Sequence, residues 1–290
     1  MLPALAWVQA ALVCAALTSV AGCRGPATVQ AELGEARRLS AELRVQFSKA
    51  TDASNRAVMA DTDEASVTFA HEAEQASKLV ENDVTQLSAL LGSLQIVDET
   101  QILQRFQKQF ADYLVVDKQV LALAVENTNL KAQQLSFGPA REAADRFKAA
   151  LDHLSPSLPA KDQCRAEELV ANAVLSVREM QLLQGPHIAS PEDAFMTALE
   201  QQSSALESKA ATDLTALSGL VDAPSLAAAQ AAFEQLKGFA RQIVSLSRTN
   251  SNVRSLDLSL RVKPPLVNAC EESARALQSA LANEGSKATR

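Results

Sequence analysis

Apolar side chains recur at intervals of three and four residues through long stretches of this chain. The spacing is unbroken from Phe69 to Leu94 and from Leu103 to Leu123, and it returns from Phe137 to Leu154 and from Leu256 to Leu281. Such spacing puts apolar side chains on one stripe of an α-helix, and the stripe must pack against other helices to leave water. The pattern therefore predicts antiparallel helical bundles.

Composition supports an all-α fold of more than one domain. The 290 residues exceed a typical single domain, and the chain is 47% hydrophobic but only 4% aromatic, with nine glycines and ten prolines. Helix-forming residues dominate, while the aromatic and β-branched residues that favour strands are scarce. A formal net charge of −7 repels phosphate backbones, so nucleic acid is not expected as a partner.

The chain contains an internal repeat. Phe110–Phe137 aligns without a gap over Phe233–Leu260, and Leu87–Leu94 aligns over Leu214–Val221. The fourth helical segment aligns only if the second copy carries seven extra residues, which is two helical turns. We therefore predict two tandem up-down-up-down four-helix bundles, with residues 1–22 as a signal peptide, 23–156 as the first bundle and 157–290 as the second.

Polar segments mark the expected helix ends. In the first copy they lie near Asp61–Asp63, Val97–Glu99 and Glu126–Asn129. In the second copy they lie near residues 185–191, 222–225 and 249–252. Ser155–Pro159 contains two prolines and is expected to link the bundles, while Gly138-Pro139 predicts a local kink.

The segment Phe106–Leu154 resembles the four-helix-bundle sensor domain of methyl-accepting chemotaxis receptors. It reads FQKQFADYLVVDKQVLALAVENTNLKAQQLSFGPAREAADRFKAALDHL, with an aromatic-spaced third helix, a short polar turn and an apolar fourth helix. The second copy follows more loosely, with Leu236 in the place of Tyr113. The resemblance implies a non-catalytic sensor. Its ligand would be either a small molecule or a partner protein of the envelope or receptor type. A structural spacer or scaffold lipoprotein without a small ligand is the alternative.

The sequence departs from a receptor in one respect, because neither a second membrane span nor a cytoplasmic signalling region follows the last predicted helix. Four helices return a chain to the side where it began. The second bundle is therefore expected beside the first, as in a receptor dimer, which would make the protein an intramolecular pseudo-dimer. No enzyme activity is expected.

The N-terminus resembles a bacterial lipoprotein signal. An apolar run from Leu2 to Gly22 ends in Val20-Ala21-Gly22-Cys23, and the resemblance implies cleavage before Cys23 and lipid attachment to its thiol. An uncleaved anchor or a simple signal peptide are the alternatives, because the start lacks a basic residue and the run is long enough to span a bilayer. All three export the rest of the chain to a periplasmic or extracellular environment, and the lipoprotein reading anchors it in the cell envelope on the periplasmic side. Arg24 after Cys23 favours the outer membrane.

Chemical motifs are scarce. His71, His153 and His187 stand apart from one another and from the cysteines, so neither a metal site nor a cofactor is expected. Cys164 and Cys270 would both remain in an oxidising compartment, where a disulfide between them and a plain buried Cys270 thiol are both open.

A small ligand would be expected between helices near the Asp61 and Asn127 turns or their counterparts His187 and Asn250. Three cations lie near these turns, although surface charges are common on helices and no binding residue is assigned. They are Lys131, Arg248 and Arg254.

Overall fold

The computed structural model describes residues 26–154 and 160–288, and these residues form helices and turns without a strand. The prediction of an all-α fold of helical bundles is confirmed. Four segments are single helices: α1 (Pro26–Met59), α2 (Asp63–Leu94), α6 (Ala160–Ala189) and α7 (Asp193–Leu217). Two longer segments are composite. One joins α3 (Val97–Glu126), α4 (Thr128–Leu135), η1 (Ser136–Ala140) and α5 (Arg141–Asp152); the other joins α8 (Ala223–Thr249), α9 (Ser251–Asp257), η3 (Leu258–Val262) and α10 (Lys263–Ala288).

The helices end close to the polar segments predicted to interrupt them. Thr62 precedes α2 in an extended conformation, and its hydroxyl oxygen accepts a hydrogen bond from the Ala65 amide at 3.1 Å. This bond satisfies one of the free N–H groups of the first turn. Gln95 then ends α2 in the left-handed conformation.

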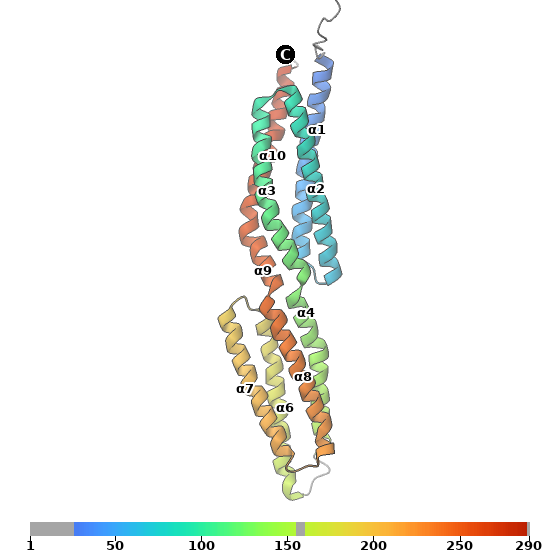
Figure 1. The fold of residues 1–290 in the computed structure, drawn as a ribbon, viewed down its shortest axis with the longest axis vertical. Helices are drawn as coiled ribbons and strands as arrows, with labels where there is room; N and C mark the ends of the chain where they lie inside the picture. The colour runs from blue at the N-terminus through green and yellow to red at the C-terminus, as the bar shows by residue number, and fades with distance from the viewer. Residues whose placement is uncertain (1–25, 155–159, 289–290) are drawn as a thin grey trace, which may run out of the picture.

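The helices form two four-helix bundles that lie end to end (Figure 1). One bundle contains α1, α2, α3 and α10, and its core joins residues between Leu33 and Tyr113 to Cys270, Ala274, Leu277 and Leu281. The other contains α5, α6, α7 and α8, and its core joins Phe147 and Leu151 to residues between Ala166 and Ile243. We call them the α1 bundle and the α6 bundle.

The predicted division into residues 23–156 and 157–290 is therefore wrong as a division into bundles. Each copy of the repeat supplies three helices to one bundle and its fourth helix to the other. The cause lies at Glu126–Asn129 and Thr249–Asn252, where a reversal of the chain was predicted. The chain bends there but continues in the same direction, so the bundles lie end to end rather than side by side (Figure 1).

The exchange explains the seven extra residues of the second copy. Helices α1, α2 and α3 contain 34, 32 and 30 residues, whereas α6, α7 and α8 contain 30, 25 and 27. The fourth helix of the second copy packs on the longer set. It therefore needs more turns than α5, which packs on the shorter set.

Both composite segments contain a π-helical turn at equivalent places in the repeat, η1 and η3. Pro139 lies inside η1, and Pro264 is the second residue after the end of η3. A proline cannot donate to the preceding turn, and its ring clashes with a regular α-helical backbone. A π turn accommodates this and adds one residue to the turn.

The added residue changes which side chains face the core. Phe137, Leu256 and Leu260 were predicted on the apolar stripes, but they are exposed by 65%, 42% and 67%. Ala132, Ala140, Ser251 and Ser255 occupy the buried positions instead. The register shift therefore turns large apolar side chains outward at the junction between the bundles.

Some predictions concern residues outside the described ranges, namely the signal segment 1–22, the lipid attachment at Cys23 and the linker Ser155–Pro159. Among the described helices, none has an apolar stretch of the length that a membrane crossing needs.

Candidate functional site

The two composite helices contact each other at a polar junction between the bundles. The Thr128 amide donates to the Ser251 hydroxyl oxygen at 3.0 Å, and the Ser251 amide donates to the Thr128 hydroxyl oxygen at 3.0 Å. Asn129 and Asn252 exchange an equivalent pair of bonds from amide to side-chain oxygen at 3.1 and 3.2 Å. These partners are 123 residues apart, which is the offset of the sequence repeat. The repeat therefore pairs with itself here.

Two further asparagines shape the bend in each composite helix. Asn127 and Asn250 have φ angles of 49° and 57°, in the left-handed region that asparagine tolerates better than most residues. Asn252 donates its side-chain amide to the Asn127 side-chain oxygen at 2.8 Å, and Asn129 donates to Asn250 at 2.8 Å. The first N–H groups of α4 and α9 have no partner within their own helix, and they are hydrogen-bonded across the junction instead. These bonds stabilise a bend in each composite helix without a reversal of the chain.

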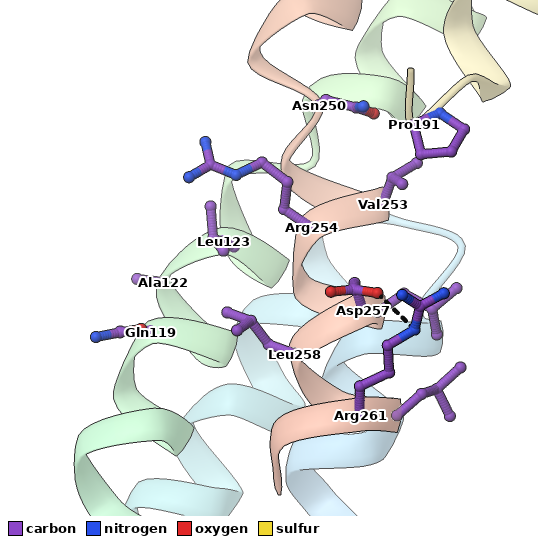
Figure 2. A pocket seen from close by; sticks show the side chains of 12 residues that line it. Gln119, Ala122, Leu123, Pro191, Asn250, Val253, Arg254, Asp257, Leu258 and Arg261 are labelled. Atoms are coloured by element: carbon purple, nitrogen blue, oxygen red, sulfur yellow. Dashed lines mark ion pairs between the residues drawn. The ribbon is translucent and has the colours of Figure 1, made fainter. Parts of the chain in front are cut away.

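Beside this junction lies an open groove of about 930 Å³ between α3 and the α9–η3 segment (Figure 2). Its size falls in the range of small-molecule sites. The lining is mostly apolar, with a few charged side chains among the leucines. It consists of Gln119, Ala122, Leu123, Pro191, Asn250, Val253, Arg254, Leu256, Asp257, Leu258, Leu260 and Arg261.

Arg254 is the charged side chain of the groove that is available to a ligand. It is exposed, and it has no side-chain hydrogen bond or ion pair with any residue that the structure describes. Arg261, in contrast, pairs with Asp257 at 3.0 Å. In the view of Figure 2, Arg254, Leu123 and Leu258 lie on the same side of α9. The groove therefore offers a free guanidinium next to apolar surface.

The other cations that the sequence indicated are engaged elsewhere. Lys131 lies 3.5 Å from Asp63 and donates to the Glu126 carbonyl at 2.8 Å. Arg248 and His187 both contact the same carboxylate oxygen of Glu200, at 2.6 and 2.8 Å. The hydrogen bond from Arg248 is the main cause that lowers the pKa of Glu200. Of the predicted positions, Asn250 and Arg254 alone line the groove.

Sequence reasoning missed a buried ion pair in the α1 bundle. The Lys263 ammonium lies 2.8 Å from the Ser54 hydroxyl and 3.4 Å from the Asp117 carboxylate, and Ser54 donates to Asp117 at 2.6 Å. Burial lowers the pKa of Lys263, and Asp117 opposes that effect. Asp117 lies four residues after Tyr113, and Lys263 lies four residues before Val267. This spacing puts both charged residues on the apolar stripes of their helices, and it was the sequence signal for a buried ion pair.

The structure contradicts a disulfide between Cys164 and Cys270. Both thiols are free; Cys164 is exposed on α6, whereas Cys270 is buried in the core of the α1 bundle. The exchange of fourth helices separates the two cysteines. Burial raises the pKa of Cys270 to about 12, which keeps its thiol protonated. Within residues 26–154 and 160–288, histidine, cysteine and carboxylate side chains do not gather into a metal-binding group.

No protein-family model matches the chain, and no curated protein is similar to it.

Proposed function

We propose that this chain is a non-catalytic, lipid-anchored envelope protein whose helical bundles bind a small ligand in the groove at their junction. The observation that carries the proposal is the guanidinium of Arg254, which is unpaired among the described residues and lies in an apolar groove of about 930 Å³. Apolar pockets that contain a small number of polar groups are the usual form of ligand sites. The buried charges of Asp117 and Lys263, in contrast, are paired with each other within the fold.

The resemblance to chemoreceptor sensor domains supports a sensing role, in which ligand binding changes how the protein meets an envelope or receptor partner. The groove is suited to this role because residues of both bundles line it, Gln119 from the α1 bundle and Pro191 from the α6–α7 turn. Lipid attachment at Cys23 would hold the bundles at the periplasmic side of a membrane. The mass of the mature N-terminal peptide tests that attachment.

A thermal-shift screen of residues 24–290 against amino acids, carboxylates and other metabolites tests the binding proposal. A ligand at about 100 times its dissociation constant adds roughly 2.7 kcal/mol to the free energy of unfolding. We expect one chemical class to raise the melting temperature by a few degrees, and Arg254→Gln to remove the shift. Arg241→Gln, which changes an exposed arginine of α8 outside the groove, is the matched control.

A spacer or scaffold is the second candidate function. It is favoured by the two composite helices, which run through both bundles and join them into one elongated body (Figure 1). A screen in which no class shifts the melting temperature, or in which Arg254→Gln leaves every shift unchanged, would contradict the ligand proposal and leave this alternative.

A further inference from the structure

The composition of the groove indicates what kind of molecule it would bind. Seven of its twelve lining residues have hydrocarbon side chains, and two of them, Leu123 and Leu258, lie on the same side of α9 as Arg254 (Figure 2). Covering apolar surface is favourable in proportion to the area removed from water. A ligand with an apolar portion would therefore gain more here than a wholly polar one.

The net charge of the groove determines which ligand charge it favours. Arg254 and Arg261 contribute two positive charges and Asp257 one negative charge, which leaves one net positive charge on a chain whose net charge is −7. Since Asp257 pairs with Arg261, the unbalanced charge lies on Arg254. A guanidinium binds carboxylates through charge-assisted hydrogen bonds, which are stronger than bonds between neutral groups.

From these two features we infer that the ligand is an amphipathic carboxylate, an organic acid with an alkyl chain of medium length. The inference rests on the proposed function and names its ligand class. The carboxylate binds the Arg254 guanidinium, and the alkyl chain covers Leu123 and Leu258, which lie on the same side of α9 as Arg254 (Figure 2). Short polar acids would leave these leucines exposed, and the positive charge of a cationic amphiphile would be repelled by the Arg254 guanidinium.

Titration calorimetry of residues 24–290 with octanoate, decanoate and dodecanoate, each below its micellar concentration, tests the class. We expect affinity to increase about fourfold for each pair of added methylene groups, which corresponds to half-burial of each group in an open groove. Decanol and decyltrimethylammonium, which keep the chain but lack the carboxylate, should bind at least tenfold more weakly than decanoate.

Matched variants test the place of binding. Arg254→Gln should weaken decanoate binding about tenfold and Leu123→Asn, beside Arg254, about fivefold. Arg241→Gln and Leu182→Asn change an exposed arginine and an exposed leucine outside the groove and should stay within about twofold of the unaltered protein. Equal decanoate affinity in Arg254→Gln and the unaltered protein would overturn the inference.

The outcomes separate failure of the ligand class from failure of the proposed function. If decanoate does not bind but a short acid or amino acid does, and Arg254→Gln abolishes that binding, the class is wrong and the groove remains a ligand site. If no compound binds in a way that depends on Arg254, both are wrong. Sedimentation with phosphatidylglycerol vesicles separates binding of a free acid from binding of an anionic membrane lipid. Sedimentation that depends on Arg254, without decanoate binding, would overturn the inference that the ligand is a free carboxylate.

Discussion

Replacing Asp117 by alanine is expected to lower the free energy of unfolding by about 3–5 kcal/mol. The side chains of Asp117 and Lys263 are each only 3% exposed, so the substitution would leave a buried ammonium whose remaining described partner is the Ser54 hydroxyl. A buried charge without its counter-charge is costly because the interior solvates it poorly. Urea denaturation followed by circular dichroism measures the loss.

Two controls separate the buried charge from a general effect of the substitution. Asp152→Ala removes an exposed partner of Lys148 on α5 and should change the free energy of unfolding by less than about 1 kcal/mol. The double variant Asp117→Leu with Lys263→Met replaces the pair by apolar side chains and should recover most of the loss. A loss below about 1 kcal/mol in Asp117→Ala would show that Lys263 is not buried as described.

Asn250→Ala should lower the free energy of unfolding by about 2–4 kcal/mol. Alanine is strained at the φ angle of 57°, and the variant loses two buried hydrogen bonds of the Asn250 side chain. One bond is accepted from the Asn129 amide at 2.8 Å, and the other is donated to the Ser190 carbonyl at 3.0 Å. Chemical denaturation of the two proteins under identical conditions gives the difference.

Two asparagine variants test that explanation. Asn250→Gly loses the same hydrogen bonds but relieves the strain, so it should be about 1 kcal/mol less damaging than Asn250→Ala. Asn127→Ala should also be milder, because Asn127 accepts one bond from Asn252 and its own side-chain amide has no partner among the described residues. Equal losses in all three variants would contradict the roles assigned to these side chains.

The sequence was sufficient to predict the helices but not their partners. Apolar spacing and polar breaks located the helix ends because both depend on local chemistry, as at Thr62. The direction of the chain at Asn127 and Asn250 depends instead on hydrogen bonds between residues 123 apart. The same repeat is compatible with reversal or continuation of the chain, so periodicity alone could not distinguish side-by-side from end-to-end bundles.

The candidate site was predictable in part. Arg254 and Asn250 were recognised as polar residues near a predicted turn, and both line the groove. Leu260 was assigned to the core because regular α-helical periodicity was assumed through η3. The π turn that exposes it arises from the prolines and from packing against the other bundle, and a pattern of threes and fours does not reveal it. The exposed apolar side chains at the junction could therefore be identified only from the structure.

Small-angle X-ray scattering of monomeric residues 24–290 tests the exchanged, end-to-end arrangement most directly. The composite segment α8–α10 runs from residue 223 to residue 288, and its 66 residues span about 100 Å at the helical rise per residue. End-to-end bundles should therefore give a maximum particle dimension of at least this length. In side-by-side bundles the longest helix would be residues 251–288, whose 38 residues span about 57 Å. With a width of about four helices, or roughly 40 Å, such a particle would measure about 70 Å at most, and a maximum dimension near that value would contradict the end-to-end arrangement.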